Sequence, residues 1–293
     1  MGVTNALCLS ADPAVLARRF QGFFDAVLVD APCSGEGMFR RVPESRGEWT
    51  LEGVLGCQKR QREILESAAA MLRPGGRFVY STCTLNHYEN ADQVAWLCSM
   101  HPEFHQEAFH VPGVDADGQY TCYPHRFRGE GQFAALLRKD GGEAVPALPS
   151  LPAADRKETA LLREFSRFED PVFRFGETLV SIPECPELKG LKVLRCGLHL
   201  GTVRSGRFCP DHAWAVSRIP PRLSEVSLSE EQAMQYLAGE VVREAEGRGW
   251  VLSRYQGMVL GLGKVSDGVM KNHYPKGLRK THLTSEDEAG ENV

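Results

Sequence analysis

The sequence lacks the long apolar runs and the cysteine patterns that mark several classes of protein. No apolar run approaches the roughly 20 residues that a membrane-spanning helix needs. The nine cysteines are an odd number, and they form no CxxC pair and no cysteine–histidine spacing typical of a zinc site. The N-terminus does not follow the basic, apolar and small-residue order of a secretory signal. These absences predict a cytoplasmic protein with free thiols, no membrane segment and no metal.

The composition is that of a globular protein with two domains. Of the 293 residues, 42% are hydrophobic and 25% are charged, which argues against disorder, collagen or a coiled coil. At roughly 100–200 residues per domain, this length predicts two domains. A segment rich in proline, glycine and alanine, residues 142–155, is expected to link them.

Residues 1–141 alternate between strand-like and helix-like patterns. Short apolar runs predict strands at Ala26–Val29, Arg77–Tyr80 and Gln132–Leu137. Apolar residues at helical spacing predict helices over residues 57–73 and 89–100. Alternating strands and helices predict an α/β domain with a doubly wound sheet.

Residues 156–283 show a different pattern, in which short strands are separated by turns. Strands are predicted at residues 177–182, 191–194, 213–217 and 250–262. Helices are predicted at residues 156–168 and 229–246. The second helix has capping-box spacing at Ser227 and Glu230, and an apolar face formed by Met234, Leu237 and Val241. This half is predicted to be α+β, and an acidic tail follows at residues 284–293.

Two predicted strands of the first half end in similar ways, at Asp30-Ala31-Pro32-Cys33 and at Ser81-Thr82-Cys83. In an open α/β sheet, ligands bind in the crevice beyond the carboxyl ends of the strands. Both thiols are therefore expected to face that crevice, and to lie together if the two strands are neighbours. Most cysteines are simply small buried hydrophobic residues, but the shared position at a strand end favours a functional site.

These segments also carry a family resemblance. Val29–Arg41, VDAPCSGEGMFRR, resembles motif IV of the RNA cytosine-C5 methyltransferases (the Sun family), and Arg73–Asn90, RPGGRFVYSTCTLNHYEN, resembles motif VI. Within that family, Pro124–Lys139 and the KNHYPKGLR of Lys271–Arg279 are most similar to the RsmF-type small-subunit rRNA methyltransferases. The resemblance implies a partial class I, Rossmann-like methyltransferase sheet, followed by a smaller PUA-like RNA-binding region at residues 156–283.

The resemblance implies a role for each residue at the two strand ends. Cys83 is the nucleophile that adds to carbon 6 of the target cytosine, a reaction that requires a thiolate. Asp30 holds the ring-nitrogen side of the base, and Cys33 assists the release of Cys83. The implied cofactor is S-adenosyl-L-methionine (SAM), with Asp12, Asp30 and Pro32 beside it.

The glycine-rich SAM loop, which this family carries well before motif IV, has no counterpart in the sequence. The resemblance is therefore to an enzyme without its N-terminal part. We expect this chain alone neither to bind SAM well nor to methylate, and we expect its sheet to expose an apolar edge. Two alternatives stay open: a non-catalytic RNA-binding remnant, and one half of a split methyltransferase.

The net charge of −4 conceals a basic segment near the C-terminus. Residues 254–280 contain six basic residues and a single acid, Asp267. Basic residues interleaved with aromatic ones suit phosphate contact and base stacking, whereas the alternative is a solvated basic face with core tyrosines. Together with the resemblance, the segment implies RNA of the small ribosomal subunit as partner. The candidate RNA-binding residues are Lys264, Lys271, His273, Tyr274, Lys276 and Arg279.

Overall fold

The computed structural model describes residues 3–142, 150–165 and 171–279, which form two compact units. The N-terminal unit contains residues 11–142, and the C-terminal unit contains residues 3–10 with residues 150–279. Residues 3–10 join the C-terminal unit because β1 (Leu7–Ser10) pairs antiparallel with β11 (Lys192–Cys196). Half of the predicted linker, residues 143–149, and the whole predicted acidic tail lie outside the described residues.

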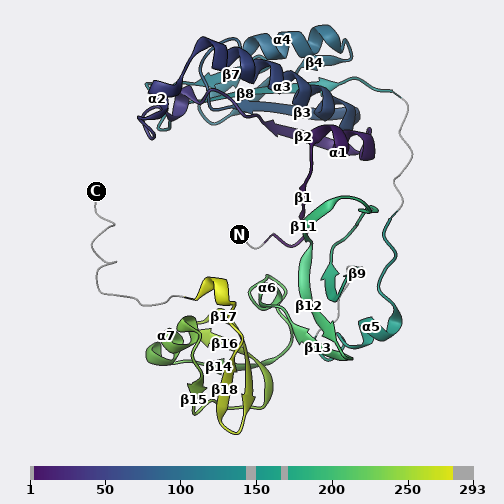
Figure 1. Cartoon of the computed structure of the whole chain (residues 1–293), viewed down its shortest axis with the longest axis vertical. Coiled ribbons are helices and arrows are strands. Elements are labelled where there is room, and N and C mark those ends of the chain that lie inside the picture. The colour runs from purple at the N-terminus through teal and green to yellow at the C-terminus, as the bar shows by residue number, and fades with distance from the viewer. Residues whose placement is uncertain (1–2, 143–149, 166–170, 280–293) are drawn as a thin grey trace. The chain divides into compact units, whose positions relative to one another are not determined.

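A mixed sheet organises the N-terminal unit (Figure 1). Its strand order is β2 (Phe24–Asp30), β3 (Leu72–Thr82), β8 (Gln132–Lys139) and β4 (Phe104–Gln106). The strand β7 (Gln119–Cys122) also pairs with β8. β2 runs parallel to β3, and β8 runs antiparallel to it. The three strands predicted for this half are therefore confirmed as one set of neighbours.

Two helices cover one face of this sheet (Figure 1). They are α3 (Leu51–Met71) and α4 (Ala91–Met100), and the core between them and the sheet includes the fully buried Leu65, Phe78 and Leu137. α3 begins six residues before the predicted start because the Thr50 hydroxyl accepts a hydrogen bond from the Gly53 N–H and caps the helix. The short helices α1 (Pro13–Arg19), η1 (Glu36–Met38) and α2 (Ser45–Glu48) complete the unit.

The opposite side of β2 is open to solvent. β2 is the last strand in the order of its sheet, and Leu28 in its middle is 67% exposed. Its neighbour Val29, which points toward α3 and α4, is buried. β2 therefore presents an exposed apolar residue beside an edge that pairs with no other strand among the described residues.

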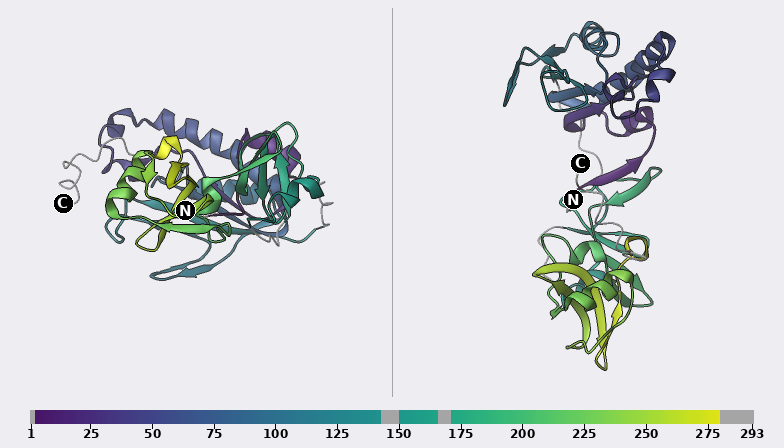
Figure 2. Two further views of the ribbon diagram at one scale, coloured as in Figure 1. Left: turned by 90° about the horizontal axis from the view of Figure 1, so that it is seen from below. Right: turned by 90° about the vertical axis from the view of Figure 1, so that its left-hand side faces the viewer.

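A small hairpin projects from the N-terminal unit (Figure 2). It consists of β5 (Phe109–Val111) and β6 (Val114–Ala116), paired antiparallel around a turn at Gly113. Three-residue strands are too short for a residue pattern to reveal, so the sequence did not predict them.

Besides the β1–β11 pair, the C-terminal unit contains a four-stranded sheet and a five-stranded sheet, in which most neighbouring strands are antiparallel. The first has the order β13 (Arg207–Pro210), β12 (Leu198–Arg204), β10 (Thr178–Ser181) and β9 (Val172–Phe175). The second has the order β14 (Ser224–Ser227), β16 (Gly249–Tyr255), β17 (Met258–Ser266), β18 (Val269–Asn272) and β15 (Val242–Arg243). Its helices are α5 (Arg156–Ala160), α6 (His212–Ala215), α7 (Glu230–Ala238) and η2 (Lys276–Leu278). An α/β unit is thus followed by an α+β unit, as predicted.

The prediction of a strand at residues 213–217 was wrong. These residues begin in α6, because the Asp211 carboxylate accepts a hydrogen bond from the Ala213 N–H and caps a helical turn. Trp214 of that turn is fully buried, and its indole N–H donates to the Ile219 carbonyl oxygen. A buried single turn has the same short apolar pattern as a strand.

The predicted bounds and face of the helix at residues 229–246 were also wrong. α7 ends at Ala238 because Gly239 adopts a left-handed conformation with φ 88°, which closes the helix. Its capping box is formed by Ser229 and Gln232, not by Ser227 and Glu230. The buried side chains are Ala233 and Tyr236, whereas Met234 is 41% exposed and Val241 lies beyond the helix.

Two further elements differ from prediction in length. The helix predicted at residues 156–168 is helical only to Ala160, and residues 166–168 of that prediction lie outside the described residues. The strand predicted at residues 250–262 is a hairpin, since the chain reverses between β16 and β17. Gln256 and Gly257 form the turn, both with positive φ, which matches the two-residue turns that join antiparallel strands.

Candidate active site

The structure brings the thiols of Cys33 and Cys83 together. Their strands are parallel neighbours, with Asp30 paired to Ser81, so both chains leave the sheet at the same end. The two sulfur atoms lie 3.3 Å apart, within hydrogen-bond distance for sulfur. This geometry allows a proton to be shared between the two groups.

The Cys33 thiol resists ionisation. Burial, followed by the hydrogen bond to Cys83, raises the pKa of the Cys33 thiol to about 12. Cys33 is therefore protonated at neutral pH and can act as a proton donor toward the Cys83 sulfur. All nine cysteines of the chain are free, so both sulfur atoms are available for chemistry.

The third predicted catalytic residue, Asp30, lies at the end of β2 with its side chain exposed. One carboxylate oxygen accepts a hydrogen bond of 2.9 Å from the Ser81 hydroxyl. This contact fixes the carboxylate at the strand end that also carries the thiols, and leaves its second oxygen free of any bond within the described residues. Pro32 follows, and its carbonyl oxygen accepts a hydrogen bond of 3.0 Å from the Gln61 amide of α3.

A buried carboxylate that the sequence analysis missed holds the two cysteine loops together. Glu89 is fully buried and accepts hydrogen bonds from the backbone N–H and the hydroxyl of Ser34, the residue after Cys33. It also accepts a hydrogen bond of 2.8 Å from the Gln61 amide and another of 2.8 Å from the Asn86 amide. Glu89 thus joins the Cys33 loop, the Cys83 loop and α3. Its place in the HYEN sequence before a helix was the only available signal, and an acid there is also typical of an ordinary helix start.

Gly37 allows the two loops to touch. Its N–H donates a hydrogen bond of 2.8 Å to the Cys83 carbonyl oxygen. A Cβ atom at position 37 would lie 2.7 Å from that oxygen and 2.7 Å from the Gly131 carbonyl oxygen, which is closer than a side chain tolerates. Gly35 differs, since it has φ 71° and no atom within 4 Å of a Cβ placed there. The GEG sequence therefore combines a turn with a close backbone contact.

Asp12, the first predicted SAM contact, caps a helix. One carboxylate oxygen accepts a hydrogen bond of 2.8 Å from the Ala14 N–H at the start of α1. The residue also lines a cavity of about 470 Å³, together with Arg60 and Glu63 of α3. Helix capping alone explains an aspartate at this position, and its second oxygen is still available for a ligand.

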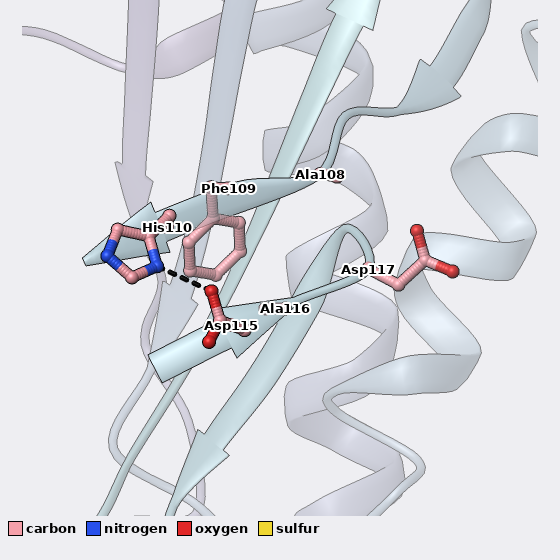
Figure 3. A pocket seen from close by; sticks show the side chains of 6 residues that line it. All are labelled: Ala108, Phe109, His110, Asp115, Ala116 and Asp117. Atoms are coloured by element: carbon pink, nitrogen blue, oxygen red, sulfur yellow. Dashed lines mark hydrogen bonds and ion pairs between the residues drawn. The ribbon is translucent and has the colours of Figure 1, made fainter. Parts of the chain in front are cut away.

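Another hollow of the N-terminal unit lies on the β5–β6 hairpin and has a volume of about 510 Å³. Figure 3 shows His110 and Asp115 on its two strands. The His110 Nδ1 and the Asp115 Oδ1 are 2.5 Å apart. Both side chains are largely exposed, and none of the predicted site residues lines the hollow.

The predicted RNA-binding residues fall into two groups. Lys264 and Lys271 are exposed cross-strand neighbours on β17 and β18. The Lys264 ammonium lies 5.5 Å from the Trp250 ring, and the His273 ring lies 4.4 Å from the same ring. Desolvation of His273, together with the charges of Lys264 and Lys271, lowers its pKa, so the ring is neutral at pH 7. We call Trp250, Lys264, Lys271 and His273 the β17–β18 surface.

The remaining predicted residues have structural contacts. Tyr274 packs its ring against Tyr236 and His212, with centroids 5.5 and 5.3 Å away. The Arg279 guanidinium donates hydrogen bonds to the Tyr274 carbonyl oxygen. Lys276 is exposed at the start of η2. Tyr274 therefore contributes to the core, the alternative that the sequence left open for tyrosines of this segment.

Within residues 3–142, 150–165 and 171–279, no three His, Cys, Asp or Glu side chains are grouped to hold a metal ion. No helix in the described part of the chain is long and apolar enough to cross a membrane.

Three consecutive stretches of the chain match domains of one family. Residues 1–138 match the family described as 16S rRNA methyltransferase RsmB/F. Residues 156–217 match the RsmF rRNA methyltransferase first C-terminal domain, and residues 223–280 match the methyltransferase RsmF PUA domain. The chain is similar to the RsmB/F family along these three stretches. These matches confirm the resemblance and the predicted fold class, a Rossmann-like methyltransferase sheet followed by a PUA-like region.

Two similar curated proteins share one name. The chain is 30% identical to ribosomal RNA small subunit methyltransferase F of Klebsiella pneumoniae, over 94% of this chain and 63% of that protein. It is 31% identical to the Shewanella loihica protein of the same name, over 97% of this chain and 64% of that protein. The chain thus spans less than two thirds of the length of these curated relatives.

Among solved structures, the chain is similar to NSun6 from Pyrococcus horikoshii, determined with SFG. The identity is 33%, over 39% of this chain and 30% of that chain, with a TM-score of 0.33. The RsmB/F family as a whole implies use of SAM.

Proposed function

We propose that this chain carries the base-binding and nucleophilic centre of a SAM-dependent rRNA (cytosine-C5)-methyltransferase. The observation that supports the proposal most directly is the 3.3 Å contact between the Cys33 and Cys83 sulfur atoms at the ends of two parallel strands. Carbon 5 of cytosine is too weak a nucleophile to take a methyl group unaided, so a thiol must first add to the ring.

In the proposed reaction, the Cys83 thiolate forms a bond to carbon 6 of cytosine. The electron pair of the carbon 5–carbon 6 double bond then moves toward ring nitrogen 3, where Asp30 holds a proton or a hydrogen bond. Carbon 5 becomes electron-rich enough to take a methyl group. Bound SAM supplies that methyl group from its sulfonium centre.

Release of the product requires two bonds to break. The proton on carbon 5 leaves to a base, and the electron pair left behind re-forms the double bond and expels the Cys83 sulfur as a thiolate. Cys33, protonated at neutral pH, lies close enough to donate its proton to that leaving sulfur. A proton donor beside the leaving group accelerates this kind of step.

Asp12, Asp30 and Pro32 are the residues proposed to lie beside SAM. The two carboxylates are exposed, and each has only one oxygen committed to a hydrogen bond within the chain, to the Ala14 N–H and to the Ser81 hydroxyl. A carboxylate oxygen of this kind suits the hydroxyl and amino groups of an adenosine moiety. Pro32 has no N–H to donate, so it would contribute only its ring and its carbonyl oxygen.

The C-terminal unit is proposed to bind the rRNA of the small ribosomal subunit in the cytoplasm. On the β17–β18 surface, two lysines border an exposed histidine and the half-exposed Trp250. Lysines neutralise phosphates, and aromatic rings stack on bases. Lys276, Tyr274 and Arg279 follow on the same segment, with Tyr274 and Arg279 shaping it rather than reaching outward.

Covalent capture of RNA tests the proposal. A complete enzyme that carries these two cysteines is incubated with a cytosine-containing fragment of small-subunit rRNA, with and without SAM, and the products are resolved on a denaturing gel. Cys33→Ala is expected to accumulate a protein–RNA adduct, because Cys83 still adds but is released slowly. Cys83→Ala and the double variant are expected to form none. Equal adduct from Cys33→Ala and Cys83→Ala would exclude these roles, and the matched control Cys98→Ala should behave as the unchanged chain.

A further inference from the structure

A separate cavity of the N-terminal unit lies beside the Cys83 loop. Its volume is about 340 Å³, and one wall is formed by Leu85, Asn86 and His87, the residues two to four positions after Cys83. The opposite wall comes from β7 and the turn that follows it. Pockets that enclose a small ligand begin at roughly this size, 300 Å³. We call it the β7 cavity.

The chemistry of the β7 cavity is that of a nucleotide site. Tyr120 and Tyr123 supply aromatic rings, and Tyr123 is 38% exposed. Arg126 is exposed at the cavity, and no ion pair or hydrogen bond of its guanidinium occurs among the described residues. Single-stranded RNA is recognised by stacking of its bases on aromatic rings and by contacts of cations with its phosphates.

One buried group has no partner among the described residues. The side-chain oxygen of Gln119, which lines the β7 cavity, is buried without a hydrogen-bond partner in the described part of the chain. A buried acceptor without a partner destabilises the folded chain. A ligand that donates an N–H group at this point would remove that destabilisation. Among RNA bases, adenine, cytosine and guanine carry an exocyclic amino group, and uracil does not.

We propose that the β7 cavity binds one nucleotide adjacent to the target cytosine, with preference for a base that carries an exocyclic amino group. The inference rests on the proposed function, because it takes RNA as the substrate. Asn86 supports the link to the reaction centre, since its amide donates to Glu89 and also to the Thr84 hydroxyl oxygen. A nucleotide against Asn86 and His87 therefore contacts the loop that carries Cys83.

Nucleoside monophosphates test the cavity independently of catalysis. AMP, CMP and UMP are each titrated into the full chain, and binding is followed by saturation-transfer difference NMR. AMP and CMP are expected to bind, with UMP weaker by about tenfold, the effect of one hydrogen bond of 1.4 kcal/mol. Gln119→Leu is expected to abolish that preference. Equal binding of UMP, or a preference that survives Gln119→Leu, would overturn the assignment.

A matched pair of arginine variants tests the phosphate contact. Arg126→Ala is expected to weaken AMP binding about tenfold, because a charge-assisted hydrogen bond to phosphate is lost. Arg128→Ala removes a second exposed arginine that does not line the cavity, and should leave binding unchanged. Equal effects of the two variants would mean that AMP binds elsewhere. Because these measurements need no thiol chemistry, the cavity can fail while covalent capture of RNA succeeds, and the reverse.

Discussion

Glu89 accepts two hydrogen bonds from Ser34, one from its backbone N–H and one from its hydroxyl. Ser34 directly follows Cys33, and Glu89 lies six residues after Cys83, so this contact joins the two halves of the thiol pair. The carboxylate has no exposed surface, and its donors Ser34 and Gln61 come from other segments of the N-terminal unit. The separation of the two sulfur atoms therefore depends on a residue that does not itself contact them.

Replacing Glu89 with glutamine is expected to loosen the thiol pair. The amide NH₂ of glutamine cannot accept the hydrogen bonds that one carboxylate oxygen accepts from Ser34 or Gln61. Buried groups are therefore left unpaired, at a cost of about 1–3 kcal/mol in the free energy of unfolding. Urea unfolding measures that cost, and the yield of the Cys33–Cys83 disulfide after mild diamide oxidation measures the separation of the thiols. Both the free energy of unfolding and the disulfide yield should fall relative to the unchanged chain.

Glu66→Gln is the matched control for that change. Glu66 is 44% exposed in its side chain and pairs with His101 at 2.9 Å. Exposed pairs contribute about 0–1 kcal/mol, so both readouts should stay close to those of the unchanged chain. If Glu66→Gln and Glu89→Gln alter the disulfide yield equally, Glu89 has no special role in positioning the thiols.

Removal of the Cys83 thiol is expected to make Cys33 more reactive. The hydrogen bond and the charge of Cys83 both help to raise the pKa of Cys33 to about 12. In Cys83→Ala only burial remains as a cause of the rise, so the pKa falls and more thiolate is present at pH 9. The rate of Cys33 labelling by iodoacetamide is measured from pH 7 to 10 by peptide mass spectrometry. This rate should be higher in the variant. Labelling of the exposed Cys8 serves as the internal reference.

The same pKa predicts a loss of stability in alkaline solution. The folded chain holds the Cys33 proton more tightly than the unfolded chain, whose thiol has a pKa of about 9.0. The stabilisation is complete below pH 9 and decreases as pH rises from 9 toward 12. The melting temperature, measured between pH 8 and 10.5, should therefore decline more steeply with pH for the unchanged chain than for Cys33→Ala. Parallel curves would show that Cys33 does not contribute to this dependence.

Lys264→Ala is expected to weaken RNA binding and to reduce its salt dependence. Loss of one phosphate contact lowers the slope of log affinity against log salt by about 1. The variant should also raise the pKa of His273, because one of the positive charges that lower it is gone. Fluorescence anisotropy with a labelled RNA at several salt concentrations, and NMR titration of the histidine, measure the two effects. Lys157→Ala on α5 removes an exposed lysine of the same unit and should change neither.

The sequence predicted those parts of the fold that have a local cause. β2, β3, β8 and α4 were predicted because each apolar run is bounded by turn residues or a helix start. α6 was not, because its helical turn depends on the Asp211 cap and on a buried site for Trp214 that the rest of the unit creates.

The residues of the candidate site likewise divide into those with a local signal in the sequence and those without one. Cys33 and Cys83 could be found because each follows a strand that the sequence reveals. Glu89 could not, because its donors come from residues 34, 61 and 86, which only the folded chain brings together. The inward packing of Tyr274 likewise depends on Tyr236 and His212, which lie far away in the sequence.

The contact at Gly37 has a consequence for genetic variation. In a library that samples every amino acid at each position, residue 37 should tolerate no replacement, since even a methyl group would meet the Cys83 and Gly131 carbonyl oxygens at 2.7 Å. Gly35 should accept asparagine and aspartate, which adopt a positive φ at modest cost and would meet no atoms there. Two glycines of one short motif thus differ in their mutational tolerance, and only one of them leaves room for natural diversity.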